Sequence, residues 1–138
     1  NFAAAMGRLP REEAPLAHDC LDSVGLSPFA AQRAGTLSGG QAQRVAIARA
    51  LAQRPRALLA DEPVASLDPE ATEEIMRLLR RLASNEGLAV MCVLHQPDLA
   101  QRYADHILGL RHGRTLFLER ASTVSSTDIA ALYEGATA

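Results

Sequence analysis

The chain has 138 residues, of which 48% are hydrophobic and 22% charged, with a formal net charge of −2. These values are typical of one globular domain or a large piece of one, and they exclude a disordered chain. The lack of strong positive charge argues against a nucleic-acid-binding protein. The longest apolar run, 88–94, is far too short to span a bilayer, and no signal peptide is recognised, so a cytoplasmic protein is predicted.

Helical and strand patterns alternate along the chain. Apolar periodicity and capping residues predict helices over 15–24, 41–53, 69–84, 97–104 and 128–133. Short apolar runs predict strands over 57–60, 88–94, 107–110 and 115–118. The first two strands have the continuous apolar character of buried parallel strands, and the last two flank a hairpin turn. The sequence therefore predicts an α/β fold, with a parallel sheet, flanking helices and a final antiparallel hairpin.

The helix predicted after Asp68 is the most strongly marked. Asp68 is a good N-cap, Pro69 suits the first helical position, and Asn85-Glu86-Gly87 breaks the helix. Acidic residues near its start and arginines near its end complement the helix dipole. Its apolar residues repeat at i, i+3, i+4 and i+7, a stripe formed by Ile75, Leu78, Leu79 and Leu82.

The segment Leu37-Ser38-Gly39-Gly40-Gln41 begins the helix predicted over 41–53. Ser38 and Gln41 have the spacing of a capping box, which by itself explains a helix start. The two glycines weaken the helix but leave backbone amides open to close approach. Together with the helix dipole and the Ser38 hydroxyl, these amides are suited to bind an anion. The local pattern leaves both interpretations open.

Two adjacent carboxylates, Asp61 and Glu62, end the strand predicted over 57–60. The carboxyl edge of a parallel sheet is where α/β proteins bind ligands. Asp61 is a candidate to hold Mg²⁺ through water, and Glu62 is a candidate general base for an attacking water. The alternative is a pair of solvated charges at a strand end.

The remaining candidates are weaker when taken singly. In Ser66-Leu67-Asp68, the capping role of Asp68 is sufficient to explain it, and His95 follows the strand predicted over 88–94, where a lone histidine is more often structural. His18, His106 and His112 receive no role. Cys20 and Cys92 lie far apart without a CxxC partner, so neither zinc nor a disulfide is predicted, and Cys92 is expected to be a buried apolar residue.

The order and spacing of these segments resemble the ATPase subunit of ABC transporters. The match covers residues 35–118, including the stretch 43–51 that follows Gln41. The resemblance implies the C-terminal half of a P-loop NTPase domain. Residues 1–54 would be part of the helical subdomain with the signature motif, and residues 55–138 the C-terminal part of the RecA-like core.

The resemblance also implies roles for single residues. Ser38, Gly39, Gly40 and Gln41 would contact the γ-phosphate of ATP held by the opposite subunit of a head-to-tail dimer. Asp61 would be the Walker B aspartate associated with Mg²⁺, and Glu62 the catalytic glutamate. Ser66, Leu67 and Asp68 would form the D-loop, and His95 would be the switch histidine that contacts the γ-phosphate.

Partners follow from the same resemblance. They are a second ATPase subunit, transmembrane permease subunits and, indirectly, a substrate-binding protein, with the chain bound peripherally at the inner face of the cell membrane. The segments 59–69, 94–96 and 109–111 look most like phosphonate-importer ATPases. The alternatives are a non-transport ABC ATPase and a non-catalytic fragment that supplies its signature motif in trans.

One departure from the family pattern is decisive for activity. All fourteen basic residues are arginine, so the lysine of the phosphate-binding loop G-x-x-x-x-G-K-[ST] is absent. We therefore interpret the chain, which begins at Asn1, as a fragment without the N-terminal half of the fold. The isolated chain is expected not to hydrolyse ATP.

Overall fold

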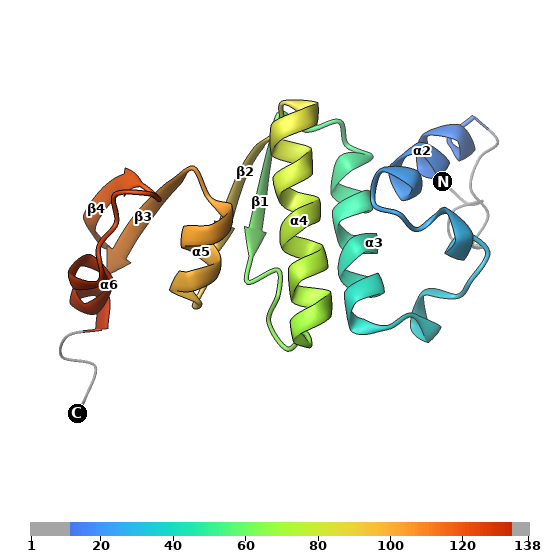
Figure 1. The fold of residues 1–138 in the computed structure, drawn as a ribbon. Coiled ribbons are helices and arrows are strands. Elements are labelled where there is room, and N and C mark those ends of the chain that lie inside the picture. Colours follow the sequence, from blue (N-terminus) through green and yellow to red (C-terminus); the bar gives the residue numbers. More distant parts are fainter. Residues whose placement is uncertain (1–11, 134–138) are drawn as a thin grey trace. The chain divides into compact units, whose positions relative to one another are not determined.

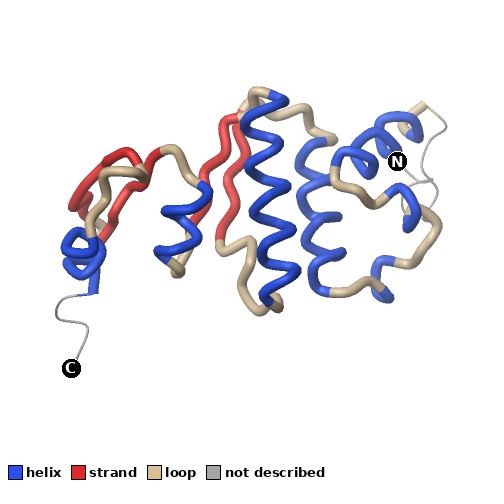
Figure 2. Tube along the Cα trace, viewed as in Figure 1, coloured by secondary structure: helices blue, strands red, loops and turns tan. Residues whose placement is uncertain are grey.

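The computed structural model describes residues 12–133, which divide after Cys92 into two compact units (Figures 1 and 2). The first unit contains helices α2 (Ala14–Ser23), α3 (Gly39–Leu51) and α4 (Pro69–Glu86), and the 3-10 turns η1 (Ser27–Phe29) and η2 (Ala34–Thr36). It also contains strands β1 (Ala57–Asp61) and β2 (Ala89–Val93). Only the last residue of β2 lies beyond the division. The second contains α5 (Pro97–Tyr103), β3 (His106–Arg111), β4 (Arg114–Arg120) and α6 (Ser126–Tyr133). The α/β fold class predicted from the sequence is confirmed.

In the first unit, helices α2, α3 and α4 lie side by side, and β1 and β2 pair beside α4 (Figure 1). Both strands run in the same direction, because α4 returns the chain between them (Figure 1). The unit is thus a β–α–β crossover extended by two more helices. The proposed subdomain boundary between residues 54 and 55 stays a prediction.

The core of the first unit is the apolar face of α4. The predicted stripe of Ile75, Leu78, Leu79 and Leu82 is buried, and Ile75 and Leu82 are fully enclosed at 0% exposure. Gly87 ends the helix at a left-handed φ of 66°, which is why glycine suits this position. The helix therefore packs as the periodicity predicted.

The opposite face of the β1–β2 sheet is not covered by any described residue in the first unit. Leu59 is 76% exposed and Met91 61% exposed, whereas Leu58 on the α4 side is buried. The prediction that both strands are buried on two faces is therefore wrong for the described chain. Cys92, also predicted to be buried, is half-buried, and burial raises the pKa of its thiol.

The second unit is organised around the predicted hairpin. Strands β3 and β4 pair antiparallel from His106 opposite Arg120 to Arg111 opposite Arg114, with an irregularity between Gly109 and Leu110. Helix α6 is attached to β3 because Arg111 Nη1 donates a 3.0 Å hydrogen bond to the Ala131 carbonyl. None of the helices within residues 12–133 is long and apolar enough to cross a membrane.

Candidate functional site

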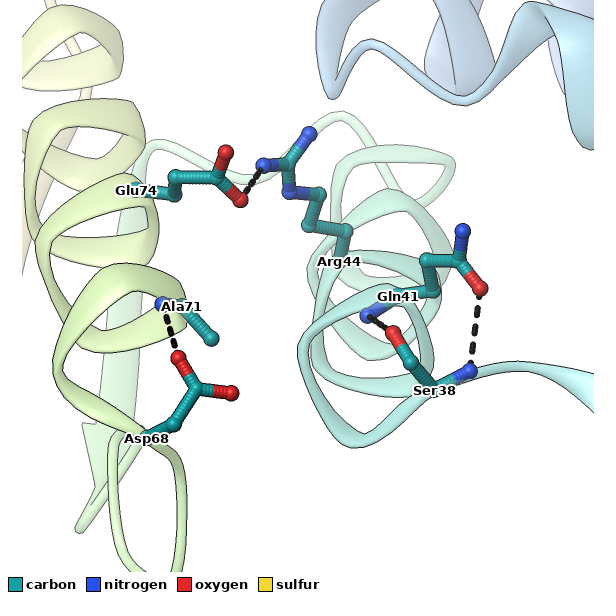
Figure 3. A network of polar contacts seen from close by, with 6 residues as sticks. All are labelled: Ser38, Gln41, Arg44, Asp68, Ala71 and Glu74. Carbon is teal, nitrogen blue, oxygen red and sulfur yellow. Dashed lines mark hydrogen bonds and ion pairs between the residues drawn. The ribbon is translucent and has the colours of Figure 1, made fainter.

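The start of α3 is a complete capping box (Figure 3). Ser38 Oγ accepts a 3.3 Å hydrogen bond from the Gln41 amide, and Gln41 Oε1 accepts a 2.9 Å bond from the Ser38 amide. The cap uses Ser38 Oγ only as an acceptor, so its hydroxyl proton is still available for donation. Ser38 and Gly39 are exposed, and Gly40 is half-buried. The helix start therefore combines a satisfied cap with donors that face solvent.

At the other candidate position, Asp61 is the last residue of β1, and both Asp61 and Glu62 are exposed. Glu62 has a positive φ of 45°, an uncommon conformation for a non-glycine residue that is often found at functional positions. Its carbonyl accepts a 3.1 Å bond from the Ala65 amide, which makes a tight turn, while Val64 is buried. The turn thus leaves the two carboxylates exposed at the end of β1, while the side chain of Val64 is buried.

The loop Ser66–Asp68 follows directly and leads into α4. Ser66 has a positive φ of 63°, and the Leu67 amide donates to the Val64 carbonyl at 3.3 Å. Asp68 caps α4 by accepting a 2.8 Å hydrogen bond from the Ala71 amide, as predicted (Figure 3). The stretch 62–68 therefore holds two tight turns and a helix cap within a few residues.

The structure brings the α3 start together with the loop Ser66–Asp68. A Cβ atom placed on Gly39 would lie 3.2 Å from Leu67 Cδ2, and one placed on Gly40 would lie 3.1 Å from Ala71 Cβ. Both distances are at the tight end of side-chain contacts. Two segments that the sequence separates by more than 25 residues are therefore packed against each other.

His95 lies in the second unit, two residues after β2, and is exposed. Its backbone carbonyl accepts a long hydrogen bond of 3.5 Å from the Tyr133 hydroxyl, a contact within that unit. Within the described residues, no group of three or more His, Cys, Asp or Glu side chains is arranged to hold a metal ion. Among residues 12–133, Asp61 is therefore an exposed carboxylate that belongs to no such group.

The residues that join α3 to α4 were not predicted from the sequence. Arg44 of α3 and Glu74 of α4 form an ion pair, one turn beyond the contact between Gly40 and Ala71 (Figure 3). They lie at a shallow pocket of about 250 Å³, which Ser38, Gln41 and Phe29 also line. No local pattern identifies a pair that is 30 residues apart, so only the packing of the two helices reveals it.

The chain is similar to known proteins in both sequence and fold. The sequence profile of the ABC transporter family matches residues 6–65. The chain is 50% identical over 124 residues to the phosphonates import ATP-binding protein PhnC of Thiobacillus denitrificans, a match that covers 90% of the chain and 48% of that relative. It is 53% identical over 119 residues to the phosphate-import ATP-binding protein PhnC of Mycolicibacterium smegmatis, with 86% and 44% covered.

A similar fold occurs in a solved structure of a dimeric bacterial ABC transporter cassette. The TM-score is 0.67 at 40% sequence identity, and the match covers 82% of this chain and 49% of that one. The chain spans about half the length of the curated relatives it matches. Sequence and fold agree, and the chain belongs to the ABC transporter family of ATP-binding proteins.

Proposed function

We propose that the chain provides the signature motif, the Walker B carboxylates and the D-loop of an ATP-hydrolysing subunit in an ABC importer. The observation that carries the proposal is the arrangement of the first unit. The capped start of α3 packs on the loop Ser66–Asp68, and that loop follows the exposed carboxylates Asp61 and Glu62 at the end of β1. Relatives named as import ATP-binding proteins support the same function.

The start of α3 has the chemistry to receive a γ-phosphate from ATP on an opposite subunit. The Ser38 hydroxyl donates one hydrogen bond to a phosphate oxygen, and the amides of Gly39 and Gly40 in the first helical turn donate others. Because Gln41 uses its Oε1 within the cap, its amide NH₂ group contributes the remaining donors. The helix dipole adds a favourable field for the negative charge.

Hydrolysis also requires a base and charge neutralisation, which Glu62 and Asp61 provide for the ATP of their own subunit and not for the ATP that Ser38 contacts. Glu62 accepts a proton from the attacking water, whose oxygen bonds to the γ-phosphorus as ADP leaves. Mg²⁺, when bound, would supply neutralisation of the developing phosphate charge, and the exposed Asp61 carboxylate would hold this hard cation through water. His95 contacts the γ-phosphate and distinguishes ATP from ADP in this proposal.

The proposed partners follow from this incomplete site. A second ATPase subunit in a head-to-tail dimer holds the ATP that Ser38 contacts, and transmembrane permease subunits hold the pair at the inner face of the membrane. A substrate-binding protein acts indirectly through the permease. The dimeric ABC cassette of similar fold supports the first partner. The proposed cargo is phosphonate or a related phosphorus compound, because the similar relatives are named for phosphonate and for phosphate import.

A chimera tests hydrolysis without relying on the isolated chain. The matching half of the Thiobacillus denitrificans relative is replaced by this chain, which is 50% identical to it. The chimera is expected to hydrolyse ATP, and Glu62→Gln to reduce the rate by about 10²- to 10⁴-fold, the usual contribution of a general base. ATP binding, measured by equilibrium dialysis, should survive this substitution.

Glu70→Gln is the matched control, because Glu70 is an exposed carboxylate in the first turn of α4 that we place outside the site. It should leave the rate within about twofold of wild type, as expected for a surface change. The isolated chain should not hydrolyse ATP. A chimera that hydrolyses ATP at an unchanged rate after Glu62→Gln would refute the assignment of Glu62.

The cargo is tested separately in cells that lack their own phosphonate-import ATPase. Expression of the chimera is expected to restore growth on a phosphonate as sole phosphorus source. Restoration on limiting phosphate but not on phosphonate would assign the chain to phosphate import instead. A chimera that binds intact ATPase subunits yet never hydrolyses ATP would support the non-catalytic alternative.

A further inference from the structure

The glycine pair at the start of α3 is not required by the backbone. Neither Gly39 nor Gly40 has a positive φ, in contrast to Gly25, Gly87 and Gly113. Glycine in ordinary helical conformation destabilises a helix relative to alanine, because it loses more conformational freedom on folding. Something other than local conformation must therefore explain both glycines.

Contact with α4 supplies the explanation for Gly40. A methyl group at this position would lie 3.1 Å from Ala71 Cβ and 3.9 Å from Ala71 Cα. Ala71 has no side-chain torsion to relieve the contact, and its amide is fixed because Asp68 accepts a hydrogen bond from it at 2.8 Å. Figure 3 shows the Ala71 methyl group directed toward the start of α3. To relieve this crowding, the backbone at Ala71 or at Gly40 would have to shift by a few tenths of an ångström.

Gly39 makes the equivalent contact with the loop itself. A methyl group there would lie 3.2 Å from Leu67 Cδ2, the end of a flexible side chain that can rotate away. Gly39 is therefore the more tolerant of the two positions. One turn further along both helices, the Arg44–Glu74 ion pair joins α3 to α4.

We propose that Ala71, through Gly40, positions the signature segment 38–41 against the loop 66–68, so that both segments of one subunit move as a single body. This inference rests on the proposed function for its catalytic consequence, because both segments are assigned there to the nucleotide interface. Ala71 is then a positioning residue that touches no nucleotide. A shift of the loop would carry the phosphate-binding amides with it.

The test moves one methyl group across the contact. Gly40→Ala, Ala71→Gly and the double variant are made in the isolated chain, with Gly35→Ala as the control, because nothing lies within 4 Å of a Cβ on Gly35. Amide hydrogen exchange is followed in segments 36–42 and 66–72. Gly40→Ala should accelerate exchange in both segments by about tenfold, the size of coupling expected for residues in contact.

The double variant should restore protection in both segments, although Ala71→Gly introduces a glycine into α4 and by itself favours exchange. Rescue of one glycine substitution by another has no explanation in helix propensity alone. Exchange that rises only in 36–42, or that the double variant fails to restore, would overturn the proposal. Gly35→Ala should leave both segments unchanged.

The same variants in the chimera test the catalytic consequence. Gly40→Ala should lower kcat by about tenfold, and Ala71→Gly should restore it. If the exchange results are as expected but Gly40→Ala leaves kcat unaffected, the positioning role is overturned, while hydrolysis by the subunit is not. A wild-type chimera that does not hydrolyse ATP would count against the proposed function alone, because the exchange experiment in the isolated chain decides the packing independently.

Discussion

Helices α3 and α6 begin with the same device but differ at the two positions inside it. Ser38 and Gln41 cap α3 reciprocally, and at α6 the Ser125 amide donates to Asp128 Oδ2 at 2.8 Å while the Asp128 amide donates to Ser125 Oγ at 3.2 Å. Between the capping residues, α3 has two glycines, whereas α6 has Ser126 and Thr127. A capping box in this protein therefore does not need glycine.

The difference shows that the glycines belong to tertiary packing rather than to helix capping. At α6, Ser126 and Thr127 are exposed, so their side chains extend into solvent. At α3 the corresponding space is occupied by Leu67 and Ala71. The familiar interpretation of paired glycines as open amides for phosphate is compatible with this packing, because Gly39 is still exposed.

The largest expected effect comes from adding a branched side chain at Gly40, inside the capping box of α3. Gly40→Val should destabilise the first unit by about 3 kcal/mol, the upper range for overpacking of a contact that cannot relax. Thr127→Val at the equivalent position of α6 should change stability by less than about 0.5 kcal/mol, because the residue is exposed. Amide hydrogen exchange at increasing urea concentration gives the free energy of unfolding of each unit and so measures both costs. Equal costs at the two positions would mean that the boxes do not differ in packing.

A smaller effect is expected from removing the caps themselves. Ser38→Ala and Ser125→Ala should each cost about 1 kcal/mol, because both remove a side-chain acceptor for a first-turn amide. The comparison becomes informative in the ATP-hydrolysing chimera. There Ser38→Ala should also lower the rate at saturating ATP by about tenfold, the loss expected for a hydrogen bond to a charged group, and Ser125→Ala should not. A similar loss in both variants would trace the effect to stability instead of phosphate contact.

The sequence predicted the cap of α3 and the helix it begins, because capping needs only residues three positions apart. Asp68 and the stripe from Ile75 to Leu82 were predicted for the same reason. The Ser125–Asp128 box was not predicted, and the helix expected over 128–133 begins at Ser126. The contact of Gly40 with Ala71 was not predicted, because it joins residues 31 positions apart and depends on how two helices pack. The exposed sheet face at Leu59 was missed too, since an apolar run specifies a tendency to be buried but not the element that buries it.

The Arg44–Glu74 ion pair should contribute less to the free energy of unfolding than the contact of Gly40 with Ala71. Arg44→Leu is expected to cost about 0.5–1 kcal/mol, because the Glu74 side chain is 49% exposed and water screens the pair. A double-mutant cycle with Glu74→Gln measures the coupling, and the control is Arg77→Leu, which removes an exposed ion pair with Glu73 inside α4. A coupling that exceeds the effect of Gly40→Ala would make the ion pair, and not the glycine, the main link between the helices.

The two boxes should also respond differently to acid. Hydrogen bonds from the Ser125 side chain and then its backbone amide lower the pKa of Asp128 below its ordinary value of 3.8. A lowered folded-state pKa means that this interaction stabilises α6 above pH 3.8 and is lost as pH falls through the folded-state value. Gln41 does not ionise, so the α3 box should be unaffected over the same range. Carboxyl-carbon NMR titration should give a low pKa for Asp128 that rises toward the ordinary value in Ser125→Ala. If the amides of 38–41 titrate together with those of 125–128, the acid response belongs to global unfolding and the contrast between the two boxes fails.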